Sequence, residues 1–169
     1  FKEDMSRYDG GTPTFYSARA EKGMDFSKLA FLLLPLRLGH TQWCLVVVDV
    51  EEENIRYYDS DSFKSVPGAS EFYDVSTVMN RRTKAIKATR ALLGHLRFST
   101  EIEWSEHYCT SPKHVDAGDS SLFVTQNALH VCLRLPLEYG QESMADLRRK
   151  VQLELLHLRL LQRIDGRVE

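Results

Sequence analysis

The chain has 169 residues, 43% hydrophobic and 27% charged, which is the balance of one ordinary globular domain spanning residues 1–169. Its formal net charge of −2 disfavours general attraction to nucleic acid or to an anionic membrane surface. No stretch has the pattern of a signal peptide or the apolar length of a membrane span, so we expect a nuclear or cytoplasmic protein.

The first predicted elements are strands. Residues 30–38, AFLLLPLRL, form an apolar run that Pro35 limits to an edge strand or breaks, because proline lacks the N–H that a strand ladder needs. Residues 44–50, CLVVVDV, are apolar on both faces, which is typical of a central strand covered on both sides. Residues 51–54 predict a tight turn, and residues 55–58 its antiparallel partner.

A long helix and then less regular chain are predicted next. Apolar residues recur at helical spacing over residues 70–93, and Gly94 stands where helices commonly end. A short strand is predicted over residues 96–102. Residues 108–118 are rich in turn formers and predict a loop.

Two helices complete the predicted fold. The first spans residues 119–133, with Asp119 or Ser120 available as N-cap and Pro136 ending it. Its predicted buried side comprises Leu122, Phe123, Leu129 and Cys132. The second is an amphipathic helix over residues 143–163, whose leucine-dense end, residues 153–161, is suited to docking on a partner or a second copy. The sequence therefore predicts an α+β domain with a central, mostly antiparallel sheet flanked by helices.

Basic and sulfur-containing side chains suggest no further chemistry. The basic run on the first predicted helix indicates a solvated helix face; it comprises Arg81, Arg82, Lys84, Lys87 and Arg90. Cys44 and Cys132 lie in apolar stretches and are expected to be buried, while Cys109 belongs to the predicted loop. Three cysteines without metal-like spacing favour a reducing compartment. The histidines show no ligand spacing either, so no metal and no cofactor are predicted.

Two segments in the right order resemble a known protease family. Residues 25–62 contain QWCLVVVD followed by IRYYDSDS, and residues 111–124 read SPKHVDAGDSSLFV. Both are similar to the motifs of the SUMO (sentrin)-specific cysteine proteases, peptidase family C48, and residues 144–161 resemble that family's last helix. The resemblance implies a papain-like, adenain-like fold. It also implies that the N-terminal part of the family domain is missing or shortened, with only Phe15 and Tyr16 left of it.

The family's mechanism needs a cysteine at a helix N-terminus, a histidine base, an orienting aspartate and a glutamine near the oxyanion. Carried over by motif, the aspartate is Asp59, whereas the histidine position holds Gln42. The cysteine position holds Ser120 and the oxyanion glutamine position holds His114. Trp43 matches the tryptophan that packs over the substrate's glycine tail.

Alternatives remain at three of these positions. His40 precedes Gln42 by two residues on the same strand face and is an alternative base. Asp61 is an alternative to Asp59, and Cys109 is a rival nucleophile without a helix behind it. Ser120 itself is either natural or an engineered replacement of the cysteine, and a serine nucleophile still needs a strong base.

The retained framework and the replaced site residues predict a pseudoprotease that binds SUMO, another ubiquitin-like protein or another protein subunit, with no nucleic acid and no membrane as partner. The alternative is an active deSUMOylating thiol peptidase whose nucleophile is replaced in this chain. A third hypothesis is an adapter whose site was rebuilt for another ligand through His114 and Asp119.

Overall fold

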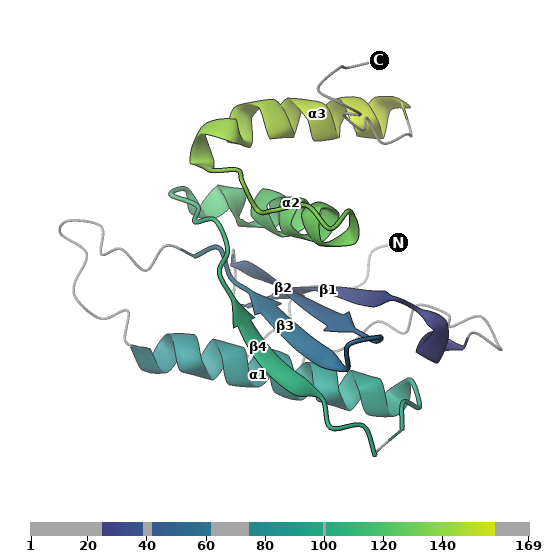
Figure 1. The fold of residues 1–169 in the computed structure, drawn as a ribbon. Coiled ribbons are helices and arrows are strands. Elements are labelled where there is room, and N and C mark those ends of the chain that lie inside the picture. The colour runs from purple at the N-terminus through teal and green to yellow at the C-terminus, as the bar shows by residue number, and fades with distance from the viewer. Residues whose placement is uncertain (1–24, 39–41, 62–74, 100, 158–169) are drawn as a thin grey trace, which may run out of the picture.

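The computed structural model describes residues 25–38, 42–61, 75–99 and 101–157. Four strands form one sheet in the order β1-β2-β3-β4. Helix α1 lies on one face of this sheet and α2 on the other, with α3 beyond α2 (Figure 1). The predicted α+β class with a mostly antiparallel sheet is therefore confirmed, because β1, β2 and β3 are antiparallel and only β4 runs parallel to its neighbour.

The bounds of the elements are as follows. The strands are β1, Phe31–Arg37; β2, Trp43–Asp49; β3, Asn54–Tyr58; and β4, Ser105–Cys109. The helices are α1, Val75–His95; α2, Ser120–Cys132; and α3, Met144–His157. Short 3-10 turns span Phe26–Lys28, Ala117–Asp119 and Gln141–Ser143. None of the described helices is long and apolar enough to cross a membrane.

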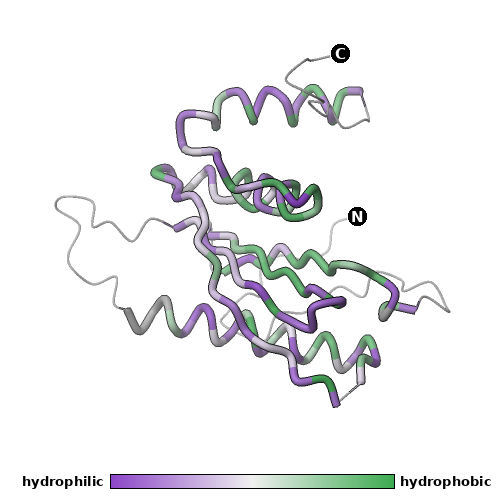
Figure 2. Tube along the Cα trace, in the orientation of Figure 1, coloured by the Kyte–Doolittle hydropathy of each residue, from purple (hydrophilic) through white to green (hydrophobic). Residues whose placement is uncertain are grey.

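Strand β2 is the centre of the fold, as its two-sided apolar pattern predicts. Its residues from Cys44 onward are buried, and successive side chains alternate between two cores. Cys44, Val46 and Val48 face α1, whereas Leu45 and Val47 face α2. Figure 2 shows the apolar β1 and β2 beside the polar turn that follows β2. Pro35 lies on β1, the edge strand, opposite Leu45.

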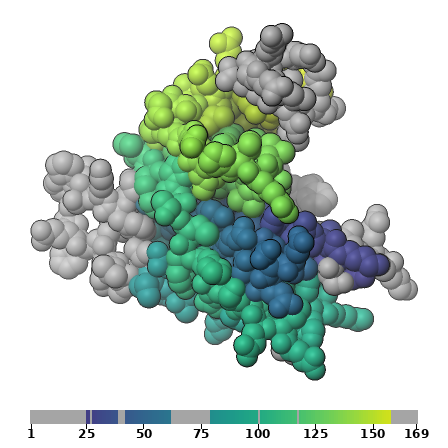
Figure 3. Space-filling model, viewed as in Figure 1, coloured from purple at the N-terminus to yellow at the C-terminus, as the bar shows by residue number. Residues whose placement is uncertain are grey.

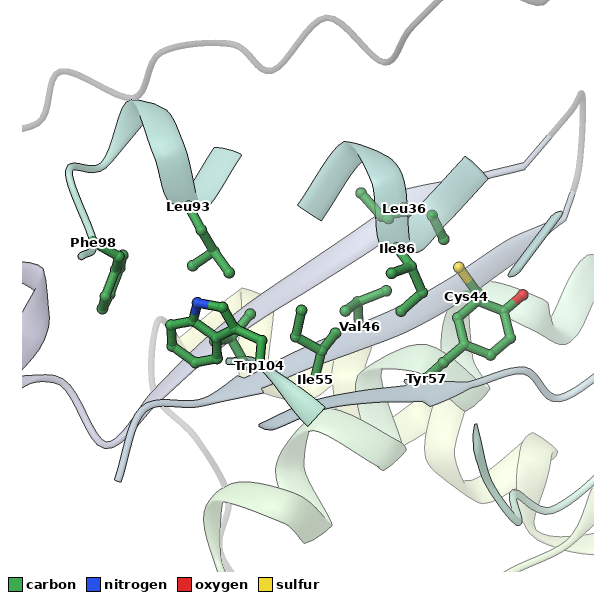
Figure 4. Close-up of a cluster of buried hydrophobic side chains, with 11 residues drawn as sticks. Leu36, Cys44, Val46, Ile55, Tyr57, Ile86, Leu93, Phe98 and Trp104 are labelled. Atoms are coloured by element: carbon green, nitrogen blue, oxygen red, sulfur yellow. The ribbon is translucent and has the colours of Figure 1, made fainter. Parts of the chain in front are cut away.

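The core on the α1 side combines strand and helix residues with an aromatic pair. Phe98 and Trp104 pack edge to face with ring centroids 5.5 Å apart, below Leu93 of α1 (Figure 4). The strand predicted over residues 96–102 is wrong: this segment connects α1 to the sheet, and Leu96, Phe98 and Ile102 anchor it in the core. The last strand is instead β4, where a loop was predicted from residue 108 onward.

After two helices, α1 and α2, the residue with positive φ is an arginine and not a glycine. Gly94 lies inside α1, and the residue with positive φ is Arg97, at 62°. The amide of Phe98 bonds to the Leu93 carbonyl and that of Arg97 to the Gly94 carbonyl, which is a Schellman motif. Arg134, with φ 53°, repeats this arrangement after α2, so that helix stops before Pro136 through its own hydrogen bonds.

Helix α2 buries a face that is partly polar. Phe123, Val124, Gln126 and Asn127 are buried, but the prediction that Cys132 is buried is wrong: it is the last residue of α2 and is exposed. Asn127 Nδ2 donates to Ser111 Oγ at 2.9 Å, and its Oδ1 accepts from Tyr139 Oη at 2.6 Å. These bonds join α2 to the segment that follows β4 and to the segment between α2 and α3.

Three members of the basic run bind neighbouring elements, so the prediction of a plain solvated face holds only for Lys84 and Lys87. Arg81 pairs with Asp61 at 2.8 Å, and Arg90 pairs with Glu106 of β4 at 2.8 Å. The guanidinium of Arg82 lies 4.3 Å from the centroid of the Tyr108 ring. These contacts fasten α1 to the sheet edge and to the chain after β3.

Helix α3 covers α2, and the two form the upper layer of the space-filling view (Figure 3). Met144 is buried, whereas Leu153, Leu155 and Leu156 are exposed. The apolar end predicted from sequence is thus uncovered as far as residue 157; the rest of the predicted helix lies outside the described residues.

Candidate functional site

Asp59 follows β3 directly, and both its carboxylate and its backbone carbonyl accept hydrogen bonds. Its Oδ2 accepts a hydrogen bond from Tyr57 Oη at 3.0 Å, and its Oδ1 accepts one from the amide of Asp61 at 3.0 Å. Lys113 Nζ donates to the Asp59 backbone carbonyl at 2.7 Å. Burial first, then the nearby Cys44 and Asp59, raises the pKa of Tyr57 well above its ordinary value, so the phenol stays a donor. The carboxylate is therefore fixed in orientation.

Gln42, just before β2, reaches both Asp59 and His114. Its Nε2 lies 3.4 Å from Asp59 Oδ1 and 3.4 Å from His114 Nε2. The Leu38 amide donates to the Gln42 carbonyl at 2.7 Å, which continues the β1–β2 ladder to this residue. An amide NH₂ carries two hydrogens, so this single group serves both acceptors. The structure thus brings three of the predicted site residues into contact.

His114 is buried, with 3% of its surface exposed. Its amide donates to the Ser60 carbonyl at 2.8 Å, and its ring packs edge to face on Phe123 of α2 at 5.8 Å. Because Gln42 Nε2 only donates, His114 Nε2 is the acceptor and Nδ1 carries the hydrogen. That Nδ1 has no partner within the described part of the chain. An imidazole donor thus stands where the family resemblance implies an amide donor.

Ser120 is the first residue of α2 and is 1% exposed. It lies one helical turn before Phe123, the residue against which His114 packs. Asp119, one of the two residues that the sequence offered as N-cap, occupies that position, yet its side chain makes no capping bond to α2. Its carboxylate instead accepts from Gln141 Nε2 and pairs with Arg148 of α3.

Of the alternative site residues, one lies outside the described part of the chain and the other two have different contacts. His40 lies outside the described residues. Asp61 pairs with Arg81 and supports Asp59 through its amide. Cys109 ends β4 rather than lying in a loop, and it packs beside Tyr58 in the core on the α2 side. Burial raises the pKa of the Cys44 thiol, which suits a core residue and not a nucleophile.

Trp43 begins β2 and is half-buried on the α2 side of the sheet. It packs against the core formed by Leu45, Val47, Tyr58 and Val124. Part of the indole thus remains accessible beside the candidate site, next to Gln42 in the chain.

The chemistry available to this cluster is hydrogen bonding rather than proton transfer through Gln42. A carboxamide does not take up a proton near neutral pH, so Gln42 cannot perform the histidine's part in a cysteine-protease mechanism. In the described ranges no three histidine, cysteine, aspartate or glutamate residues are arranged to hold a metal ion. The hydrogen bonds among Gln42, Asp59 and His114 therefore hold these three side chains in fixed positions.

Several residues that shape the site carry no signal in the sequence. Tyr57 and Lys113 fix Asp59, while Gln141 and Arg148 take the Asp119 carboxylate. Gln141 and Arg148 are 22 and 29 residues from Asp119, and no local spacing rule links positions so far apart.

The fold is that of the papain-like cysteine proteases. The sequence model described as Ulp1 protease family, C-terminal catalytic domain, matches residues 2–160, and the chain belongs to this family. The family prediction is thereby confirmed.

Known relatives and solved structures agree with this assignment. Sentrin-specific protease 3 of mouse and of human are each 27% identical over 148 residues, which is 84% of this chain. Human sentrin-specific protease 5 is 26% identical over 148 residues, 85% of this chain. This chain spans 23% of the length of the first two relatives and 17% of the third.

The structural likeness concerns the fold. The C-terminal Ulp1 protease domain in complex with Smt3, the yeast ortholog of SUMO, superposes with a TM-score of 0.57 at 19% identity, covering 79% of this chain and 55% of that one. The Chaetomium thermophilum Ulp1-like SUMO protease catalytic domain gives 0.54 at 17% identity, with 82% and 49% covered.

Proposed function

We propose that this domain is a catalytically inactive SUMO-protease-like module that binds a ubiquitin-like protein, SUMO being the first candidate. The observation that carries this proposal is the place of Gln42. Its amide contacts Asp59, the residue that the family motif makes the partner of the histidine. A general base is thus replaced by a group that donates two hydrogen bonds and accepts no proton.

The rest of the site supports the same proposal. Ser120 supplies a hydroxyl where the motif has a thiol, and a hydroxyl needs a strong base to become a nucleophile. His114 is committed through Nε2 to Gln42 and through its ring to Phe123. The replacements at Gln42 and Ser120 both act against catalysis, and neither removes a residue of the hydrophobic core, which supports a folded module without the protease chemistry.

The partner is proposed from the family and from the accessible aromatic residue. The related Ulp1 domain was crystallised with Smt3, a SUMO ortholog, and the curated relatives are named as sentrin-specific proteases. Trp43 keeps its place beside the site and is only half-buried, so it remains available to pack on a polypeptide tail. Large aromatic side chains of this kind contribute strongly to protein interfaces.

Binding is tested by isothermal titration of the chain with SUMO, NEDD8 and ubiquitin. We expect a measurable Kd for SUMO or one of the other two, and a loss of at least about tenfold in Trp43→Ala. Leu135→Ala is the matched control: it truncates a side chain that is 50% exposed, just past the far end of α2. Absence of binding to all three proteins would refute the proposed partner class, and an equal loss in both variants would refute the role of Trp43.

A further inference from the structure

The carboxylate of Asp119 is turned away from the helix that it precedes. Asp119 is the N-cap residue of α2, with φ −89° and ψ −8°, and no α2 amide donates to its side chain. Aspartate at this position ordinarily accepts from the first-turn amides and stabilises the helix. Here the side chain is 3% exposed and faces the start of the last helix instead.

Two side chains hold the carboxylate there. Gln141 Nε2 donates to Asp119 Oδ2 at 2.5 Å, and the Arg148 guanidinium pairs with Oδ1. Gln141 Oε1 also accepts from the Val115 amide at 2.7 Å, so the one carboxamide joins both ends of the segment 115–119. This clamp, formed by Gln141 and Arg148, fixes the segment that connects His114 to Ser120.

The clamp has an electrostatic consequence at position 120. A helix carries partial positive charge at its amino terminus, which favours a negative or electron-rich group there. A carboxylate that caps the helix uses these amides and adds a full negative charge beside them. Pairing with Arg148 compensates the Asp119 charge, and the turned side chain leaves the α2 amides to other groups.

We propose that Arg148 and Gln141 are positioning residues that withdraw the Asp119 carboxylate from the amino terminus of α2, so that this positive end acts at position 120. The inference rests on the proposed function only in taking position 120 as part of the ligand-binding site. The electrostatic potential that α2 produces at position 120 is the same whether or not a partner protein binds.

A thiol placed at position 120 reports this field directly. The acidity of the thiol in Ser120→Cys is measured by thiolate absorbance, as the difference from the parent chain, so that the other cysteines and the tyrosines cancel. Arg148→Ala leaves the buried carboxylate without its positive partner, or free to turn toward α2, and either change makes the potential at the sulfur more negative. We expect the thiol to become about tenfold less acidic.

Matched variants separate positioning from general damage to the fold. Arg148→Lys keeps the charge and should restore most of the acidity, whereas Arg149→Ala removes an exposed neighbouring arginine and should leave it within about twofold. Gln141→Ala is a milder test that decides the matter if Arg148→Ala does not fold, with about threefold lower acidity expected.

The result that overturns the proposal is unchanged acidity in Arg148→Ala, or in Gln141→Ala where that variant decides. Failure of Arg148→Lys to restore the acidity, or an equal drop in Arg149→Ala, does the same. No ubiquitin-like protein takes part in this measurement. Its outcome is therefore independent of the titrations that test the proposed function.

Discussion

Replacing Asn127 by alanine should destabilise the domain far more than its small size suggests. The side chain is fully buried, and two short hydrogen bonds end on it, from its Nδ2 to Ser111 Oγ and from Tyr139 Oη to its Oδ1. Both partners keep other contacts: Ser111 Oγ lies 2.8 Å from Ser60 Oγ and 3.3 Å from the Pro112 carbonyl oxygen, and Tyr139 Oη also donates to the Phe123 carbonyl at 3.1 Å.

The expected magnitude follows from these contacts. Each lost hydrogen bond costs about 1 kcal/mol where its partner keeps an alternative, and the vacated space adds on the order of 1 kcal/mol. We expect Asn127→Ala to lower the free energy of unfolding by about 2–3 kcal/mol. Tyr139→Phe leaves Asn127 Oδ1 without its donor and should cost about 1–2 kcal/mol.

Urea unfolding of both single variants and the double variant measures these terms and their coupling. The shared hydrogen bond predicts a coupling energy of about 1 kcal/mol. Thr125→Ala, an exposed position on the same helix, is the control and should change stability by less than about 0.5 kcal/mol. A loss below 1 kcal/mol in Asn127→Ala, or additive single effects, would refute the account of this network.

Three further predictions follow from the helix ends, the tyrosines and the cysteines. Arg97→Gly and Arg134→Gly remove strain at positive φ and should each raise the free energy of unfolding by about 0.5–1 kcal/mol in urea titrations; a loss of stability would contradict the Schellman geometry. Burial raises the pKa of Tyr58 to about 12, so its contribution to stability is complete below pH 10 and is lost as the pH rises from 10 to 12. Absorbance at the phenolate band should therefore show this tyrosine ionising together with unfolding, and ionisation in the folded protein at pH 10 would count against it. Iodoacetamide at neutral pH should label the exposed Cys132 in the native chain and spare Cys44, whose pKa burial raises; peptide mass spectrometry showing equal labelling would disprove this.

The central sheet could be predicted because its signals are local. A run that is apolar on both faces identified β2, and Pro35 left an edge strand or a broken strand for β1, of which the structure shows the edge strand. Strand β4 gave no such signal: its side chains are mostly exposed and polar, and only pairing with β3 makes it a strand. Likewise Arg97 takes a conformation that favours glycine, because the Schellman bonds and the packing of Phe98 outweigh the strain.

The sequence proposed which residues form the candidate site but not which side chains bond to one another. The family resemblance placed Gln42, Asp59 and His114 in one site, and Gln42 contacts both other side chains in the structure. The Gln42 amide contacts both Asp59 and His114 because of side-chain geometry, which the sequence motif does not specify. The clamp on Asp119 is a contact between distant segments, and local capping rules predict the opposite orientation for that carboxylate.

The proposed loss of catalysis through Gln42 is tested most directly by incubating the native chain with SUMO bearing a C-terminal fluorogenic group. The native chain should release no fluorophore. Ser120→Cys alone should release none either, because a thiol without a base in place of Gln42 remains incompetent. Release by the native chain, abolished by Ser120→Ala, would contradict the account and would direct attention to His40 as the base.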